Sequence, residues 1–232
     1  MNLLAIETAT EACSVALRCR DAVLERFEIA PRRHAELVLP WADELLAEAG
    51  IVRSQLDAIA VGIGPGAFTG VRLAVAMGQG LALALERPLI GISSLQILAA
   101  GARGAQPGDG VFASIDARMG EVYAAAFRIH RDGLPEAIDA PQLGSPDIVR
   151  LPDDSYGWAR GTGLAAGQGE VGQRLQAQGW RLEPGALPAA GDLARLAARA
   201  YALGVYPERP EDVQPLYLRD KVAQTIAERA AR

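Results

Sequence analysis

The sequence predicts an α/β protein of two lobes, each with a mixed sheet and covering helices, built by duplication of one unit. The two halves begin alike, with an apolar strand pattern that ends in a carboxylate, at residues 5–7 and again at 114–116. In both halves two more strand patterns, joined by a charged turn, follow. A β-β-β-α-β-α repeat of roughly 110 residues indicates a duplicated unit, with lobes at 1–103 and 104–232. Coincidence between two βαβ-rich halves is the alternative.

The first lobe begins with three strand patterns. Apolar residues run over 3–7, and apolar and polar residues alternate over 13–18 and 22–29, with a turn at Arg20 and Asp21. Alternation with a period of two is typical of strands with one buried face. These segments therefore predict an antiparallel meander.

Helices and buried strands alternate in the rest of this lobe. A helix is predicted from about residue 33 to 48, because apolar residues recur at helical spacing and Gly50 can end a helix. Pro40 lies inside this helix and is expected to kink it or split it in two. The further predicted elements are a buried parallel strand at 56–63, a helix from Thr69 to before Pro88, a strand at 88–92, and a third helix capped by Ser93 or Ser94.

The second lobe repeats these patterns. A strand at 111–115 ends in Asp116, and a second strand at 121–130 gathers apolar side chains on one face. A serine followed by a proline is typical of a helix start. The remaining predicted elements are a hairpin turn at 131–133, a strand at 134–140, a helix start at Ser145 and Pro146, a strand at 156–160, and helices around 168–178 and 192–203.

Charge and cysteine content restrict the compartment and the partners. The formal net charge is −5, so the chain gains nothing from counterion release on RNA and any RNA role is expected to run through a partner. Cys13 and Cys19 lie on one predicted strand, about 20 Å apart at about 3.3 Å per residue, too far for a disulfide. The N-terminus lacks a basic signal region, and the apolar stretch 73–85 is shorter than the about 20 residues of a membrane span. We expect a cytoplasmic protein with free thiols and no membrane contact.

The segment 62–70 (GIGPGAFTG) connects a predicted buried strand to the second helix. Exposed amides and the dipole at a helix N-terminus favour an anion. However, the segment lacks the Gly-Lys-Ser/Thr ending of a P-loop and the spacing of a dinucleotide-binding fingerprint. The alternative is a tight strand-to-helix turn in which glycines permit positive φ and close packing. Residue chemistry favours the turn and leaves the anion site open.

The helix after this segment is apolar nearly all round, because only Arg72 and Gln79 are polar between residues 71 and 85. A helix without a polar face must be covered on every side, and its own sheet covers one face only. Another polypeptide is therefore expected to cover the rest. Complete burial within this chain is the alternative.

Small residues recur every four positions along this helix, at Gly70, Ala74, Gly78 and Ala82. They form a smooth ridge that a second helix can approach closely. We predict a partner interface at these four residues and at Trp41, because large aromatic residues often anchor such contacts. Core packing is the alternative for Trp41.

Few residues are of catalytic type. The two histidines, His34 and His130, have no second histidine at i+4 and no cysteine pair nearby, as a metal site would need. Glu7 and Asp116 end strands where a kinase or ATPase would place Mg²⁺-directing carboxylates, but no glycine-containing phosphate hairpin follows Glu7. Arg118 is suited to an anion or an acidic partner, or to a surface salt bridge. We predict no catalytic, cofactor-binding or metal-binding residue.

Five segments carry a family resemblance and fall in one order along nearly the whole chain: 4–10 (LAIETAT), 34–40 (HAELVLP), 64–72 (GPGAFTGVR), 115–123 (IDARMGEVY) and 215–219 (PLYLR). In these segments the chain resembles the TsaB (YeaZ) family of the bacterial tRNA threonylcarbamoyladenosine pathway. The third and fourth segments are long enough to be specific. Glu7 departs from the family, in which aspartate is more usual.

The resemblance implies a duplicated actin-like, ribonuclease H-like fold, as in sugar kinases and heat-shock ATPases. It implies a non-catalytic subunit that binds and activates TsaD, the catalytic subunit that transfers threonylcarbamoyl to N6 of the adenosine next to the anticodon, with the ATPase TsaE as third member. TsaD binds metal through His-x-x-x-His on the first helix, where this chain has His34 and Val38. TsaB-like chains bind TsaD through their first two helices, or form homodimers through the same face, and reach tRNA only through the complex. No cofactor of its own is implied.

Two other functions are weighed. An ATP-dependent small-molecule phosphotransferase would need Mg·ATP between the lobes, and a metalloprotease would need metal ligands that the sequence does not offer. The resemblance favours the interaction subunit.

Overall fold

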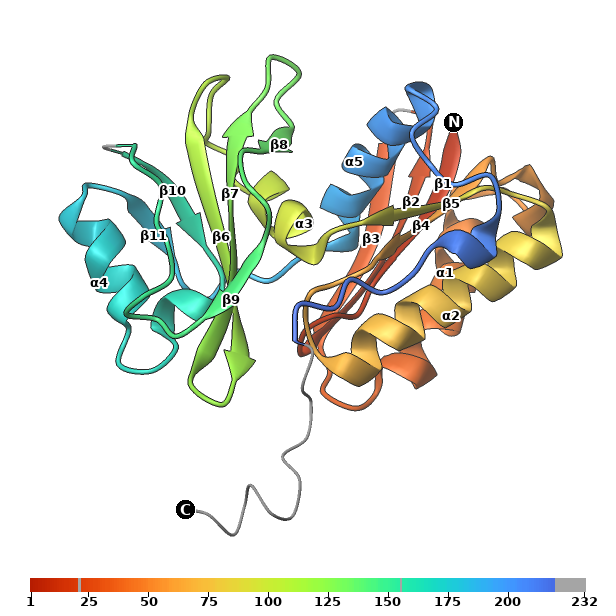
Figure 1. The fold of residues 1–232 in the computed structure, drawn as a ribbon. Coiled ribbons are helices and arrows are strands. Elements are labelled where there is room, and N and C mark those ends of the chain that lie inside the picture. Colours follow the sequence, from red (N-terminus) through yellow and green to blue (C-terminus); the bar gives the residue numbers. More distant parts are fainter. Residues whose placement is uncertain (21, 155, 220–232) are drawn as a thin grey trace, which may run out of the picture.

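Each half of the chain forms its own mixed β-sheet in the computed structural model, which describes residues 1–20, 22–154 and 156–219 (Figure 1). The first sheet has the strand order β3-β2-β1-β4-β5, and the second has the order β11-β10-β6-β7-β8, with β9 paired to β7. The strands are β1 (Asn2–Glu7), β2 (Ala12–Cys19), β3 (Ala22–Ile29), β4 (Ala58–Gly62), β5 (Leu89–Ile92), β6 (Gly110–Arg118), β7 (Glu121–Ile129), β8 (Pro135–Ala137), β9 (Gln142–Gly144), β10 (Gly157–Arg160) and β11 (Arg181–Glu183).

The two sheets have the same topology, which confirms the duplication. In each sheet the first strand of the half, β1 or β6, pairs antiparallel with the next strand and parallel with a later one, β4 or β10. The edges also match, because β3 and β8 are antiparallel edges while β5 and β11 are parallel edges.

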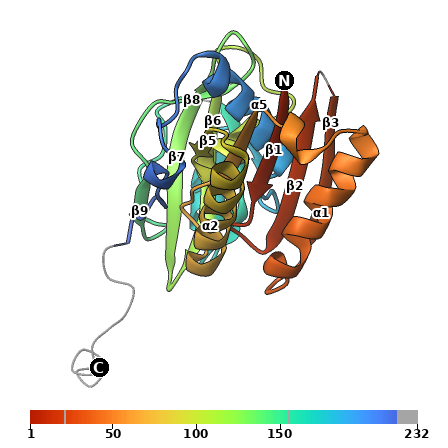
Figure 2. The ribbon, with the colours of Figure 1, turned by 90° about the vertical axis from the view of Figure 1, so that its right-hand side faces the viewer.

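The described part of the chain contains five α-helices, which form three layers around the two sheets: α1 (His34–Ala49), α2 (Phe68–Leu85), α3 (Ser94–Ala100), α4 (Glu170–Ala177) and α5 (Ala190–Ala202). Helices α1 and α2 cover the outer face of the first sheet, as Figures 1 and 2 show, and α4 covers the outer face of the second. Helices α3 and α5 lie between the two sheets, and each packs on the sheet of the other half. Helix α3, from the first half, packs on β6, β7 and β8, whereas α5, from the second half, packs on the first sheet.

The hydrophobic core between the first sheet and its outer helices explains why Pro40 does not split α1. The helix runs without interruption from His34 to Ala49, so the predicted split in two is wrong, whereas the alternative of a kink at Pro40 stays a prediction. Val38 lies before the proline, and Ala42 and Leu45 lie after it, and all three are buried against the sheet. Packing on both sides holds the two turns together although Pro40 cannot donate a backbone hydrogen bond.

The second lobe has no counterpart of α1 within the described residues. The helix start predicted at Ser145 and Pro146 is wrong, because this segment makes one turn in which the N–H groups of Ile148 and Val149 donate to Ser145 O over 3.2 and 3.1 Å. The strand predicted at 134–140 is shorter than expected, because β8 spans only Pro135–Ala137, and a separate strand, β9, begins at Gln142.

Helix α2 has the length and apolar composition of a membrane span. A core helix of an α/β unit has the same properties, and six of its residues are buried. Composition alone therefore gives no argument for a membrane here.

Candidate functional site

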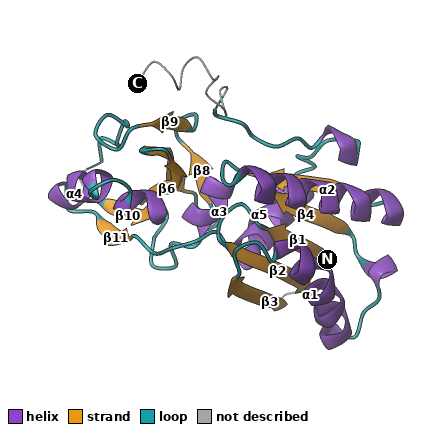
Figure 3. Ribbon diagram, turned by 90° about the horizontal axis from the view of Figure 1, so that it is seen from below, coloured by secondary structure: helices purple, strands orange, loops and turns teal. Residues whose placement is uncertain are grey.

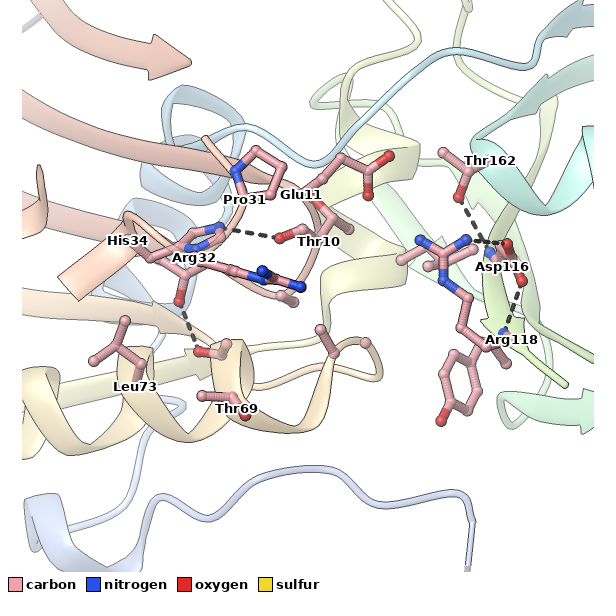
Figure 4. A pocket seen from close by; sticks show the side chains of 18 of the residues that line it. Thr10, Glu11, Pro31, Arg32, His34, Thr69, Leu73, Asp116, Arg118 and Thr162 are labelled. Atoms are coloured by element: carbon pink, nitrogen blue, oxygen red, sulfur yellow. Dashed lines mark hydrogen bonds and ion pairs between the residues drawn. The ribbon is translucent and has the colours of Figure 1, made fainter. Parts of the chain in front are cut away.

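A cleft of about 550 Å³ opens between the two lobes. Its first-lobe wall comes from the β1–β2 connection, the residues before α1 and the first turns of α2, as the close-up in Figure 4 shows. Figure 3 shows from below how α2 and the two sheets are arranged. Its second-lobe wall comes from the end of β6 and from Thr162. The cleft thus lies where the ends of β1 and β6 face each other, which is the place that the repeat predicts for Glu7 and Asp116.

Asp116 lines the cleft but is already neutralised within its own hairpin. Its Oδ1 accepts the N–H of Arg118 over 2.7 Å, and its Oδ2 accepts Nη1 of Arg118 over 2.8 Å. The N–H of Asp116 donates to Oγ1 of Thr162 over 3.1 Å. The interpretation of Arg118 as a salt-bridged surface residue is confirmed, since its side chain is 77% exposed. A cation at Asp116 would have to displace this guanidinium.

Glu7 does not line the cleft. Its side chain is fully buried, where Oε1 accepts the N–H of Ala9 over 2.6 Å and Oε2 accepts the hydroxyl of Ser94 over 2.9 Å. Burial raises the pKa of Glu7 to about 7, against the lowering effect of these hydrogen bonds. Gly62 makes room for the carboxyl group, because a Cβ at that position would lie 2.0 Å from Oε2. The residue connects β1 to α3 inside the lobe and cannot direct a metal ion in the cleft.

His34 ties the start of α1 to the β1–β2 connection. Its Nε2 lies 3.1 Å from Thr10 O (Figure 4) and 3.2 Å from Ala12 O, so this nitrogen carries a hydrogen and donates to the two carbonyls. Nε2 therefore offers no lone pair to a metal ion, and only Nδ1 of His34 could serve as a ligand. The position four residues later, Val38, is fully buried in the core. Within the described ranges, no three His, Cys, Asp or Glu residues are grouped to hold a metal ion.

The glycine-rich segment 62–70 forms a close contact between α2 and the β1–β2 connection. A Cβ at Gly66 would lie 2.3 Å from Ala9 O, and a Cβ at Gly70 would lie 2.0 Å from Thr8 O. The N–H of Ala67 donates to Ala9 O over 2.7 Å, and Thr8 Oγ1 donates to Gly70 O over 2.7 Å. These contacts favour the tight-turn interpretation, because the glycines let the first turn of α2 approach the backbone of the β1–β2 connection closely.

The ridge of small residues on α2 faces its own sheet and not a partner, so the predicted position of the interface is wrong for these four residues. Gly70, Ala74, Gly78 and Ala82 are all buried, and a Cβ at Gly78 would lie 2.4 Å from Cγ1 of Val61 on β4. Small residues let the helix approach this strand closely. They serve the contact inside the lobe.

The outward face of α2 nevertheless leaves apolar surface uncovered. Phe68 is 45% and Leu83 is 56% exposed, and Ala76 and Gly80 between them are exposed as well. We call these four residues, with Arg72, the outward face of α2. Trp41 on α1 is half-buried: part of its side chain packs against the core of the first lobe, and the rest is accessible to solvent. Its place in a partner interface stays a prediction.

Comparisons with known proteins decide the family. The family model described as "TsaD: tRNA N6-adenosine threonylcarbamoyltransferase" matches residues 27–144. The "tRNA threonylcarbamoyladenosine biosynthesis protein TsaB" of Escherichia coli (strain K12) is 40% identical over 228 residues, which cover 96% of both chains. The chain belongs to the TsaB family. The TsaB protein of Haemophilus influenzae (strain ATCC 51907 / DSM 11121 / KW20 / Rd) is 36% identical over 234 residues, 96% of this chain and 95% of its own.

A solved TsaB-family structure supports the fold assignment. The structure described as "YeaZ from Pseudomonas aeruginosa" superposes with a TM-score of 0.85 at 42% identity, covering 94% of this chain and 99% of that one. With the repeated topology of the two sheets, this match confirms the duplicated actin-like fold that the resemblance implies.

Several residues of the cleft have no signal in the sequence. Arg32 and Thr162 line it, yet nothing in their neighbourhood along the chain predicts a site, whereas Thr69, which also lines it, belongs to the segment 62–70, for which an anion site is one of the two interpretations. Arg32 adopts a positive φ of 70° just before α1, a conformation that side chains other than glycine rarely take. Only the approach of the two lobes brings these residues together.

Proposed function

We propose that this TsaB-family chain is a non-catalytic subunit of the machinery that installs threonylcarbamoyl on N6 of the adenosine next to the anticodon in tRNAs reading ANN codons. It binds and activates the catalytic subunit TsaD, with TsaE as third member, and acts on tRNA only through that complex in the cytoplasm. It carries no cofactor of its own and forms a homodimer when TsaD is absent. The names of its relatives support the pathway.

The observation that carries the non-catalytic role is the state of the cleft residues. Both carboxylates at the strand ends are already engaged: Glu7 is buried with Ser94, and Asp116 is paired with Arg118. The helix that would hold a metal has one histidine, and its Nε2 donates to two carbonyls. Neither of the two strand-end carboxylates is therefore free to direct a metal ion or to act in phosphoryl transfer or hydrolysis.

The observation that supports the partner role is the outward face of α2. Large apolar side chains such as Phe68 and Leu83 lie exposed on one helix face, together with Ala76, while the opposite face packs on the sheet. An exposed apolar face of this kind is typical of a surface that another protein covers. We therefore place the contact with TsaD on this face in place of the small-residue ridge.

The test is co-elution and activation with TsaD. We expect the wild-type chain to co-elute with TsaD and to raise the rate of threonylcarbamoyl transfer to tRNA. Ala76→Glu and Leu83→Glu should each weaken TsaD binding by about 30-fold or more, because an unpaired charge would be buried in the contact. Leu203→Glu is the matched control, since Leu203 is also an exposed leucine, 68% exposed, but lies at the end of α5.

The outcomes separate this proposal from the phosphotransferase. A wild-type chain that neither binds TsaD nor raises the transfer rate would contradict the partner role. Turnover of Mg·ATP by the isolated chain, lost in Asp116→Asn, would favour the phosphotransferase instead. Glutamate at Ala74 or Gly78 would not be informative, because both positions are buried in the lobe and such variants would test folding.

A further inference from the structure

The last described residues form a strap that crosses from one lobe to the other. We define the strap as residues 210–219, which begin with the 3₁₀ turn Pro210–Asp212 beside α2 and end at Arg219 beside the β6–β7 hairpin. Figure 1 shows this dark-blue segment running along α2 toward the lower ends of β6 and β9. Its position links two parts of the molecule that belong to different sheets.

The strap is anchored in the first lobe by one apolar side chain and two backbone groups. Val213 is 4% exposed and belongs to the core between the first sheet and its outer helices. Gln79 Nε2 on α2 donates to Val213 O over 3.0 Å. The N–H of Leu216 donates to Ile63 O, at the end of β4, over 2.8 Å.

A second set of anchors lies in the second lobe. Leu218 packs against the core that β6, β7 and α3 share. Arg219 Nη2 lies 2.5 Å from Oε2 of Glu121, at the start of β7, and the Arg219 side chain is only 17% exposed. Because Glu121 lies on the hairpin that also carries Arg118 and Met119, the strap holds the hairpin that lines the cleft.

Between the two sets of anchors, the strap contributes an aromatic ring to the outward face of α2. The rings of Tyr217 and Phe68 have centroids 6.1 Å apart. The guanidinium of Arg72 lies 3.3 Å from the Phe68 centroid and 5.2 Å from the Tyr217 centroid. Phe68 and Tyr217 are 45% and 47% exposed, so a protein that covers Phe68 and Arg72 also touches the strap.

The strap is not packed tightly on the molecule beneath it. A cavity of about 260 Å³ lies below, lined by the start of α2, the β6–β7 hairpin and strap residues including Leu216 and Leu218. This cavity adjoins the interlobe cleft, because Gly66, Arg118 and Tyr123 line both. A shift of the strap would therefore move residues that also line the cleft.

We propose that the strap couples partner binding on the outward face of α2 to the relative position of the two lobes. A partner that holds Tyr217 against Phe68 favours the arrangement in which both sets of strap anchors are made, and so fixes the hairpin that lines the cleft. Coupling is reciprocal, so the same anchors strengthen partner binding. This inference rests on the proposed function for the identity of the partner, TsaD, but the lobe arrangement is measurable without it.

The experiment measures lobe separation and partner affinity in the full-length chain. Spin labels at Ser54→Cys, in the first lobe, and Gln176→Cys, on α4, report the distance by pulsed electron paramagnetic resonance, in a Cys19→Ser background. Both label positions are exposed. The anchor variant is Arg219→Ala. The matched control is Arg209→Ala, because Arg209 directly precedes the strap but is 67% exposed, and its ion pairs among the described residues are with Glu211 and Asp212 of the strap.

We expect Arg219→Ala to broaden the distance distribution in the isolated chain and to weaken TsaD binding by about 5- to 10-fold, while Arg209→Ala behaves as the wild type. The charge exchange Glu121→Arg with Arg219→Glu should restore both. In the wild type, TsaD binding should narrow the distance distribution. Tyr217→Ala, which removes an exposed ring and no anchor, should leave the distances in the isolated chain unchanged but abolish this narrowing.

Two results would overturn the inference, and they differ from failure of the proposed function. If Arg219→Ala and Arg209→Ala give the same distances and the same affinity, the strap does not couple the lobes to the partner face. If circular dichroism shows that Arg219→Ala is unfolded, the Tyr217→Ala variant decides alone. The coupling is then overturned if TsaD narrows the distance distribution of Tyr217→Ala as much as that of the wild type. Absence of TsaD binding by the wild type would instead remove the proposed function, and the partner with it.

Discussion

Two glycines on α2, two residues apart, provide a sharp test of which face of the helix meets the sheet. A Cβ at Gly78 would lie 2.4 Å from Cγ1 of Val61 and 3.0 Å from Cδ1 of Leu89, whereas a Cβ at Gly80 would meet nothing within 4 Å. The substitutions Gly78→Ala and Gly80→Ala therefore change the same residue type in the same helix, in opposite surroundings.

The expected magnitudes follow from two opposing effects. Alanine is favoured over glycine inside a helix by about 1 kcal/mol, so Gly80→Ala should raise the free energy of unfolding by about that amount. Gly78→Ala gains the same helix preference but overpacks a filled core, which costs about 1–3 kcal/mol. Val61 and Leu89 are fully buried, so the upper end applies and a net loss of about 1–2 kcal/mol is expected.

The two variants should thus differ by about 2–3 kcal/mol, or about 5–10 °C in melting temperature for a chain of this length. Thermal and urea denaturation followed by circular dichroism measure this difference, with the wild type between the variants. Equal stabilisation by both substitutions would refute the reasoning, because it would mean that Gly78 faces open space. The small-residue ridge would then be free for a partner after all.

Three further predictions concern the buried polar groups. Because burial raises the pKa of Glu7 to about 7, its protonated form stabilises the fold below the unfolded pKa of about 4.3, and this contribution is lost as the pH rises to about 7. Urea denaturation should show that the free energy of unfolding falls by up to about 3 kcal/mol between pH 5 and pH 7.5, and by less in Glu7→Gln. Equal decreases in the wild type and in Glu7→Gln would contradict the assignment of this pH dependence to Glu7. Asp192 is 5% exposed and pairs with Arg103 and Arg195, which are 64% and 32% exposed. Asp192→Ala leaves no buried charge behind and should lower the free energy of unfolding by about 1–2 kcal/mol through the lost charge-assisted hydrogen bonds, against less than about 1 kcal/mol for Arg103→Ala, in which Arg195 still pairs with Asp192; a larger loss in Arg103→Ala would contradict this ranking. His34→Ala should cost about 1–2 kcal/mol through the lost hydrogen bonds, and added Zn²⁺ should leave the wild-type melting temperature unchanged. A zinc-dependent rise that disappears in His34→Ala would identify a metal site that the geometry does not support.

Local patterns predict most elements of the first lobe. The predicted strands and helices up to residue 92 agree with the structure to within about two residues at each end, because periodicity of two or 3.6 is a local property of the sequence. Pro40 is the exception. Its effect depends on the packing of Val38 and Leu45 against a sheet that local patterns do not describe.

The orientation of α2 and the composition of the cleft could not be predicted in the same way. Both faces of α2 are apolar, so periodicity does not tell which face meets the sheet, and small residues suit a partner helix and a neighbouring strand equally well. In the cleft, Arg32 and Thr162 come from different lobes. Their approach depends on how two sheets pack, which no spacing along the chain encodes. The division into lobes at residue 103 stays a prediction.

The exchange of α3 and α5 makes the two halves of the molecule interdependent. A fragment of residues 1–103 would keep the first sheet but lose α5, so Leu3, Ala5 and Ile90, all buried under that helix, would face water. A fragment of residues 104–232 would lack α3, which covers the other sheet. Each fragment carries the helix that covers the sheet of the other fragment. The halves are therefore expected to be insoluble when expressed singly, to complement each other when expressed together, and to melt as one unit in the intact chain.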